Sequence, residues 1–243
     1  MGEHSHIGWT EGTWNPWYGC TKISPGCKFC YMYREMARYG RDPFTVTRAK
    51  TTFTAPRHWK EPRLVFTCSW SDFFIESADE WRAEAWDVIR STSHTYQVLT
   101  KRPWLIADRL PSFWDEIKHR VWLGVSVESP EYLWRAGTLR EIPATVRFLS
   151  LEPLLAPMPY IPLTGIHWVI VGGESGSDRP CEVEWIIDIV DQCRVCDVPI
   201  FVKQDSGAHS GQKGRIPNEY WIKEFPKVVE TLDHSDPREV AGV

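Results

Sequence analysis

The chain has 243 residues, of which 42% are hydrophobic and 25% charged, and its formal net charge is −4. These fractions are ordinary for a globular domain, and no apolar run approaches the roughly 20 residues that cross a bilayer, which argues against a membrane protein. The negative net charge argues against a protein that coats nucleic acid over its whole surface.

Seven cysteines are an odd number in a chain long enough to build a core without disulfides, and no signal-peptide pattern precedes them. Both features argue against a disulfide framework and predict a reducing, cytoplasmic compartment. Residues 1–243 are expected to form one domain, with a basic insertion at about 41–62 and a mobile, charged tail from about 227.

Three of the cysteines follow the first predicted strand, 13–18, in a short loop that contains glycine and proline. Cys20, Cys27 and Cys30 are spaced C-x6-C-x2-C, and the backbone between them can fold tightly around a small object. Thiolates are soft ligands that bind transition metals and iron–sulfur clusters. Because three ligands leave one coordination position open, the motif favours a [4Fe–4S] cluster with one iron free for chemistry.

Two plainer interpretations of the cysteine loop stay open. A structural zinc ion would need a fourth ligand, for which His4, His6 or a distant cysteine are candidates. Alternatively, the three residues are ordinary buried thiols, although no apolar period explains their clustering. Zinc near one per chain would indicate the first, and iron with acid-labile sulfide would indicate a cluster.

The segment after the cysteine loop begins with a predicted helix, 28–40, and continues as an insertion without clear periodicity. Residues 34–63 contain eight Lys or Arg against three Asp or Glu, interleaved with aromatic residues. This composition is typical of a surface that binds nucleic acid or another anionic substrate, and the residues expected to contact it are Arg48, Lys50, Arg57 and Lys60. The plainer interpretation is a solvated loop that covers the edge of the fold.

From residue 64 onward, short apolar segments alternate with segments of helical periodicity. The predicted strands are 64–68, 96–100, 121–127, 146–150, 167–171 and 200–203, and the predicted helices are 78–91, 104–118, 130–140 and 182–196. The crossover 153–164 is rich in proline and is not expected to be helical. The alternation predicts a partial, open TIM-type α/β barrel of about seven parallel strands, with a doubly wound sheet as the alternative.

Polar residues follow each of these strands, and the carboxyl ends of parallel strands lie on the same rim. The cysteine loop follows the first strand and belongs to this rim as well. The rim residues predicted from the sequence are Ser71, Asp72, Lys101, Arg102, Ser126, Glu128, Glu152, Gly172, Gly173, Glu174 and Lys203. Their convergence on one mouth indicates a site more strongly than any single motif does.

In the cysteine loop and beyond it, the sequence resembles a known family. The segments 7–16, 19–20, 24–27 and 30–31, together with 99–103, 122–128, 147–155 and 168–176, look like the phage and bacterial proteins named for a mycobacteriophage three-cysteine protein. That family is similar to radical S-adenosylmethionine (SAM) enzymes, with a cysteine loop longer than the usual C-x3-C-x2-C. The chain departs from the family at 67–72 and at 203–207.

The resemblance implies a [4Fe–4S] cluster on the three loop cysteines, SAM as second cofactor, and an external electron donor. It implies that Phe29 lies beside the adenine of SAM, that carboxylates such as Glu128 and Glu152 bind its ribose or ammonium, and that Lys101, Arg102 or Lys203 binds its carboxylate. The full set of expected cofactor contacts is Phe29, Tyr31, Ser71, Lys101, Ser126, Glu128, Glu152, Gly172, Gly173 and Glu174. The plainer interpretation of the glycine pair is a turn that ends a strand.

The predicted function is therefore that of a radical SAM enzyme, in which one electron cleaves SAM reductively and the resulting 5′-deoxyadenosyl radical abstracts hydrogen from an unknown substrate. Candidate catalytic residues are Cys68, Asp72 and Lys203, with a buried thiol as the default for Cys68. Cys193 and Cys196 are interpreted as a packing pair at a helix end, with a zinc site or second cluster as the alternative.

Two other functions are kept as alternatives. One is a metal-containing protein of phage origin that binds, modifies or repairs nucleic acid without SAM chemistry. The other is a subunit whose substrate is delivered by a partner protein.

Overall fold

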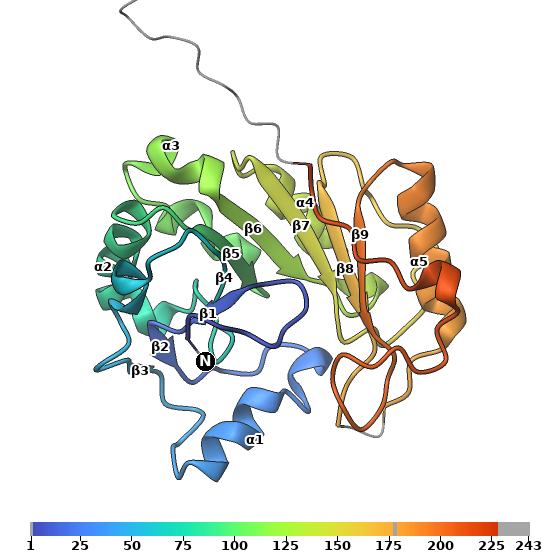
Figure 1. Cartoon of the computed structure of the whole chain (residues 1–243), viewed down its shortest axis with the longest axis horizontal. Coiled ribbons are helices and arrows are strands. Elements are labelled where there is room, and N and C mark those ends of the chain that lie inside the picture. The colour runs from blue at the N-terminus through green and yellow to red at the C-terminus, as the bar shows by residue number, and fades with distance from the viewer. Residues whose placement is uncertain (1, 177–178, 228–243) are drawn as a thin grey trace, which may run out of the picture.

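In the computed structural model of the chain, residues 2–176 and 179–227 are described. Among these residues, seven parallel strands form one curved sheet in the order β1-β4-β5-β6-β7-β8-β9, an open half-barrel (Figure 1). This confirms the predicted partial TIM-type barrel. The strands are Gly12–Trp14 (β1), Leu64–Thr67 (β4), Thr95–Thr100 (β5), Val121–Ser126 (β6), Val146–Leu151 (β7), Trp168–Gly172 (β8) and Ile200–Gln204 (β9).

The helices that follow β4, β6 and β8 cover the outer face of the sheet. They are Asp79–Arg90 (α2), Trp134–Arg140 (α4), which packs on β6 and β7, and Val183–Val195 (α5), which packs on β8 and β9. The buried residues of α5, among them Ile186, Ile189, Val190 and Cys193, recur every three or four positions, the period of a half-buried helix. A further helix, Tyr31–Arg38 (α1), lies apart from the sheet beyond the carboxyl ends of the strands (Figure 1).

The predicted helix 104–118 is wrong as a continuous element. The structure has 3₁₀ turns at Pro103–Leu105 and Ala107–Arg109 and only one short α-helix, Trp114–Ile117 (α3). Pro111 is the physical reason, because proline pushes the residue before it out of the helical region, and Leu110 is extended at φ −70 and ψ 144. The proline-rich crossover 153–164 contains no helix, as predicted.

The predicted first strand, 13–18, is two strands rather than one. Gly12–Trp14 joins the main sheet, whereas Trp17–Tyr18 (β2) pairs antiparallel with Thr47–Arg48 (β3). Pro16 lies at the break and has no N–H to donate to a ladder. Because β3 belongs to the insertion 41–62, this pairing fixes the insertion beside the β1 edge of the sheet.

The insertion is packed rather than loosely solvated. Phe53 is 2% exposed, and its carbonyl oxygen accepts a hydrogen bond of 2.9 Å from the indole of Trp14 on β1. Pro56, in the 3₁₀ turn Ala55–His58, is also buried. The insertion therefore covers an edge of the sheet, as the plainer interpretation of its sequence proposed.

Alternate residues of the central strands belong to two separate cores. On β6, Leu123 and Val125 pack in the larger core with residues of the helices, whereas Trp122 belongs to a smaller aromatic cluster with Phe148, Trp168 and Phe201. This second cluster lies on the concave face and closes it toward the amino ends of the strands. Every second residue further along these strands also lies on the concave face. Near the carboxyl ends these residues are Ser126, Glu152, Gly172 and Lys203.

Within residues 2–176 and 179–227, no helix combines the length and the apolar character needed to cross a bilayer. The charged tail predicted from about residue 227 lies almost wholly outside the described residues.

Candidate functional site

The cysteine loop lies at the carboxyl end of the half-barrel. Cys20, Cys27 and Cys30 are free and half-buried, and Cys30 directly precedes α1. Cys27 belongs to the 3₁₀ turn Pro25–Cys27, and its thiol lies 3.8 Å from the Ser24 hydroxyl. The three thiols share one electrostatic neighbourhood, because a charge on Cys27 raises the pKa of both other thiols.

Arg102, directly after β5, holds the first cysteine in place. Its side chain is 3% exposed and donates hydrogen bonds to Asp72 at 3.0 Å, to the Sγ of Cys20 at 3.8 Å and to the carbonyl of Thr21 at 3.0 Å. One guanidinium thus ties the cysteine loop to a carboxylate that follows β4.

Asp72 is itself fully engaged at the strand ends. One carboxylate oxygen accepts from the Thr100 hydroxyl at 2.7 Å and from the Phe74 N–H, and the other accepts from Arg102 and the Lys101 N–H. A carboxylate with four donors and 5% exposure acts as a structural anchor of the rim.

The electrostatics of the thiols combine burial with nearby cations. Burial raises the pKa of Cys20 to about 12, with Asp72 acting in the same direction and Arg102 acting against it. Burial also raises the pKa of Cys30, whereas Lys101 and Lys22 lower it. Without a metal the thiols of Cys20 and Cys30 are therefore protonated, and the cations beside them favour the thiolate that a metal would bind.

Glu128, which follows β6, anchors the middle of the cysteine loop. One carboxylate oxygen accepts from the Gly26 N–H at 3.4 Å, and the other accepts from Arg135 of α4 at 2.9 Å. Both side chains of the Glu128–Arg135 pair are at most 1% exposed. A Cβ on Gly26 would approach the Glu128 carboxylate to 3.1 Å, so glycine permits this close contact.

Glu174, after β8, anchors the end of the loop through Arg179. Arg179 is paired with Glu174, donates to the Pro25 carbonyl at 2.8 Å and lies 4.9 Å from the ring centre of Phe29. The predicted rim residues of β5, β6 and β8 therefore all contact the cysteine loop, directly or through one arginine.

The concave face beside the loop carries a second charged pair. Lys203 of β9 and Glu152, directly after β7, are 2.5 Å apart, with side chains 21% and 17% exposed. Tyr31, the first residue of α1, donates from its hydroxyl to the Ser69 carbonyl at 2.6 Å. Burial of this hydroxyl raises its pKa, and the nearby charges of Cys30 and Glu152 act in the same direction.

Other predicted residues have local partners. The Ser71 hydroxyl donates to the Gly19 carbonyl at 2.5 Å. A Cβ on Gly173 would collide with the backbone of Ser206, so this glycine permits close packing beside the chain after β9. Ser126 is 3% exposed at the end of β6. These three positions line the rim, and the contacts found for Ser71 and Gly173 are with the protein itself.

Cys68 has a conformation that the sequence did not indicate. It has a φ of 62°, which is unusual for a residue other than glycine, and its side chain joins the larger core. Burial raises its pKa well above the ordinary value. This agrees with the default interpretation of Cys68 as a buried thiol.

The arrangement of the potential ligands bears directly on the metal interpretations of the cysteine loop. Among residues 2–176 and 179–227, no group of three or more His, Cys, Asp or Glu side chains is arranged to hold one metal ion. This finding gives no support to a zinc site that includes His4, His6 or the Cys193–Cys196 pair, of which Cys193 is buried and Cys196 exposed. It gives no support either to a single metal ion held by the three loop cysteines. Cysteine thiolates are the usual ligands of a [4Fe–4S] cluster, and the three free cysteines of one loop supply that type of donor.

Two functional contacts were missed from the sequence, Arg135 and Arg179. Both lie beyond the strand tips, in α4 and before α5, and each pairs with a predicted rim carboxylate. Neither an arginine in a helix, such as Arg135, nor one in a loop, such as Arg179, shows in the sequence which carboxylate it pairs with, and only the pairing across elements reveals these contacts.

Comparison with family models gives one match, to a family described as a protein of unknown function (DUF5131), over residues 4–234. Searches of curated proteins and of solved structures gave no significant match.

Proposed function

The chain belongs to the DUF5131 family, and we propose that it is a radical SAM-type enzyme whose active site is the mouth of the half-barrel. The observation that carries the proposal is the attachment of the three-cysteine loop to the ends of three strands. Arg102 after β5, Glu128 after β6 and Glu174 after β8 all hold the loop over the concave face.

The residues that would hold a [4Fe–4S] cluster are Cys20, Cys27 and Cys30, and with three ligands one iron is left open. When bound, such a cluster supplies an electron for the reductive cleavage of SAM. Arg102 would remain a donor to the Cys20 sulfur, and hydrogen bonds to ligating sulfurs are one of the means by which proteins set cluster potential.

The Glu152–Lys203 pair suits a zwitterionic ligand. SAM carries an ammonium and a carboxylate at one end and a ribose diol at the other. Lys203 can donate to a carboxylate, and Glu152 can accept from an ammonium or from hydroxyls, so both can exchange their mutual contact for ligand contacts without a change in net charge.

The smaller aromatic cluster on the concave face, here called the aromatic floor, would exclude water from the site. Trp122, Phe148 and Trp168 are at most 4% exposed and close the concave face below the charged pair. A ligand would therefore enter from the carboxyl end, and its lower boundary would be apolar. In such an environment a reactive species meets few water molecules.

Anaerobic reconstitution tests the proposal. The protein is treated with iron and sulfide, and iron and acid-labile sulfide are measured; dithionite and SAM are then added, and 5′-deoxyadenosine and methionine are quantified. We expect about four iron atoms per chain and release of both products. Cys27→Ala should lose the cluster, whereas Cys196→Ala, an exposed cysteine outside the loop, should retain it. Zinc at one per chain, or a reconstituted protein that releases neither product, would refute the proposal.

A further inference from the structure

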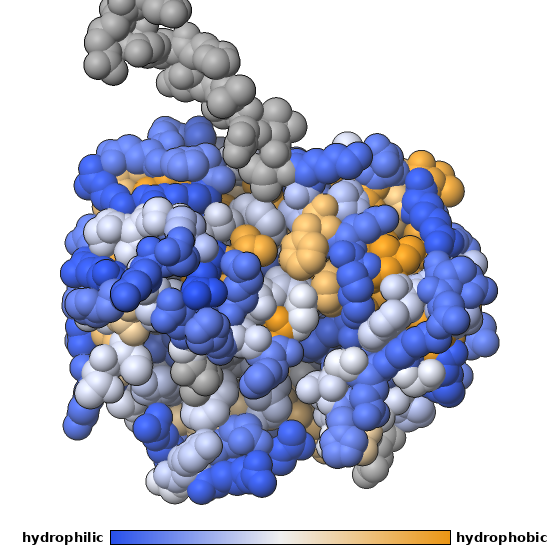
Figure 2. Space-filling model, in the orientation of Figure 1, coloured by the Kyte–Doolittle hydropathy of each residue, from blue (hydrophilic) through white to orange (hydrophobic). Residues whose placement is uncertain are grey.

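The surface around α1 combines exposed rings with exposed cations. We define the α1 face by three aromatic residues and five cations in residues 22–44. The rings are Phe29, Tyr39 and Phe44, which are 43%, 68% and 59% exposed, and the cations are Lys22, Lys28, Arg34, Arg38 and Arg41. In Figure 2 the surface over α1 is largely hydrophilic, below the mouth of the half-barrel.

Contacts between side chains make this face continuous with the cysteine loop. Lys22 lies 4.6 Å from the ring centre of Tyr33, which in turn lies 5.0 Å from the ring of Phe44. Lys22 also donates to the carbonyl of Lys28, whose ammonium lies 5.0 Å from the ring of Phe29. The face therefore begins at the candidate active site and extends along α1.

The charge of the α1 face is opposite to that of the whole chain. Residues 20–44 contain five Lys or Arg and two carboxylates, a net of +3, whereas the chain carries −4. Of the two carboxylates, Glu35 lies 3.2 Å from Arg38 and 3.8 Å from Arg34 at the exposed surface, where such pairs are weak. The face therefore keeps a positive potential that favours an anionic partner.

We propose that the α1 face binds single-stranded nucleic acid and guides it to the mouth of the half-barrel. Phosphates would contact the cations, and bases would stack on the rings of Phe29, Tyr39 and Phe44. Cations separate the three exposed rings from one another along the chain, which suits bases along a backbone, whereas a protein partner favours a continuous apolar centre. That nucleic acid is the substrate of the enzyme rests on the proposed function. Binding of nucleic acid to the α1 face does not require SAM chemistry.

The α1 face contains none of the four basic residues predicted from the sequence, and two of those four have partners within the fold. Arg48 contacts both oxygens of Glu84 at 2.6 Å, and its guanidinium lies 3.9 Å from the ring centre of Phe53. Arg57 donates to the Ser91 hydroxyl at 3.0 Å. These two arginines stabilise the fold at the sheet edge, whereas the cations of the α1 face surround the site.

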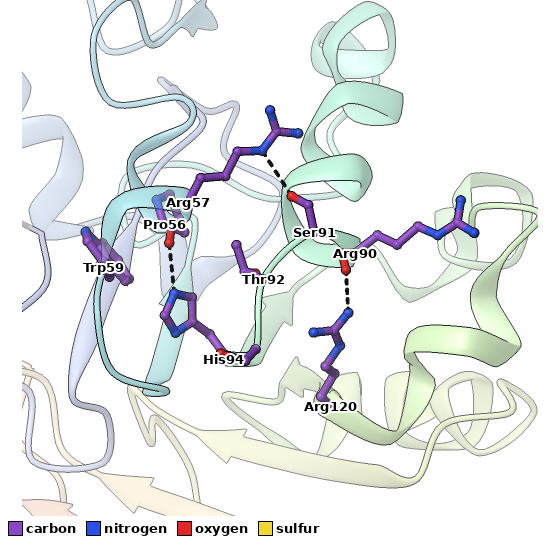
Figure 3. Close-up of a pocket in the computed structure, with 9 residues that line it drawn as sticks. Pro56, Arg57, Trp59, Arg90, Ser91, Thr92, His94 and Arg120 are labelled. Carbon is purple, nitrogen blue, oxygen red and sulfur yellow. Dashed lines mark hydrogen bonds between the residues drawn. The ribbon is translucent and has the colours of Figure 1, made fainter.

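A second basic region, at the opposite end of the strands, provides a matched control. Arg57, Arg90 and Arg120 line a depression of about 480 Å³ beside the loop that precedes β5 (Figure 3). Arg120 donates to the Arg90 carbonyl at the end of α2, and Arg90 lies 2.6 Å from Glu116. Cations at a helix carboxyl end stabilise the helix, so this region has a structural explanation.

Fluorescence anisotropy tests the proposal with a labelled 20-nucleotide poly-dT strand and a 20-base-pair duplex, at 50 and 200 mM salt and without SAM. The ring variant is Tyr39→Leu with Phe44→Leu, which keeps apolar volume. The charge variant is Arg38→Gln with Arg41→Gln, and the control is Arg57→Gln with Arg90→Gln. All six substitutions are at exposed side chains, and a single cooperative thermal transition well above the assay temperature verifies that each variant is folded.

We expect the strand to bind more tightly than the duplex. Each ring that stacks a base should weaken binding by roughly 5- to 150-fold when replaced. Each phosphate contact removed should lower the slope of log K against log salt by about 0.7, so the charge variant should lower it by about 1.4. The control should change neither quantity.

Three results would overturn the proposal: no binding of the strand at 50 mM salt, equal losses in the control, or a loss from the charge variant with none from the ring variant. The last would indicate an acidic protein partner. Release of 5′-deoxyadenosine without strand binding would overturn this inference alone, and binding without that release would overturn the proposed function alone.

Discussion

The ion pair between Asp72 and Arg102 gives the sharpest test of how the rim is held together. Replacing Asp72 by Asn leaves Arg102 charged and without its carboxylate, at a side-chain exposure of 3%. Removing one partner of a buried ion pair costs about 3–5 kcal/mol, because the remaining charge is poorly solvated. A second carboxylate, Glu76, lies 3.9 Å from Arg102, but its side chain is 57% exposed and compensates only weakly. With a urea m-value of about 2–3 kcal/mol/M, this loss should move the unfolding midpoint down by roughly 1–2 M.

The matched control is Glu84→Gln, which removes the partner of Arg48 at the surface. The side chains of that pair are 34% and 48% exposed, so the expected loss is about 0–1 kcal/mol. Both variants are followed by tryptophan fluorescence in urea, and the cysteine loop is followed by the rate at which a thiol reagent labels Cys20. We expect faster labelling of Cys20 only in Asp72→Asn, since Arg102 contacts that thiol. Equal midpoint shifts in the two variants would show that burial of the rim pair has no energetic consequence.

Three further predictions follow from the contacts of the sheet and the rim. Gly124→Ala would place a methyl group against the ring of Phe148 in the aromatic floor; we expect a loss of about 1–3 kcal/mol, and an unchanged melting temperature would contradict this packing. Burial raises the pKa of Asp205, but hydrogen bonds from Arg215 and from backbone N–H groups outweigh it and lower that pKa below the ordinary 3.8. The stability that the ionised Asp205 contributes is present above pH 3.8 and is lost as the pH falls through the lowered pKa. The difference in unfolding free energy between wild type and Asp205→Asn should therefore shrink between about pH 6 and pH 2. A difference that stays constant over this range would refute the linkage. Lys203→Met should weaken SAM binding at least about tenfold by calorimetry with the iron content unchanged, and equal affinity would exclude Lys203 from the ligand site.

The order of the strands was predictable because each strand is a separate apolar segment followed by a crossover. Apolar runs such as 121–127 and 167–171 are visible locally, and parallel strands joined by crossovers put their carboxyl ends on one rim. The same reasoning placed the cysteine loop at the mouth. It failed where a proline acts on its neighbours, as at Pro16 and Pro111, because apolar periodicity carries no information on a missing N–H or on the backbone restriction of the residue before a proline.

The sequence by itself determined which groups gather at the rim, since the chemical type of a residue and its place after a strand are local properties. Only the tertiary structure decided their partners. Glu128, a predicted ligand contact, is paired with Arg135 and the cysteine loop, and Arg102 contacts a cysteine 82 residues away. Such pairs depend on the register of strands and on the path of loops between them, and neither is encoded in the spacing of residues along one segment. The half-barrel was therefore visible in the chain, whereas the network that fastens the cysteine loop to it was visible only once the strands were side by side.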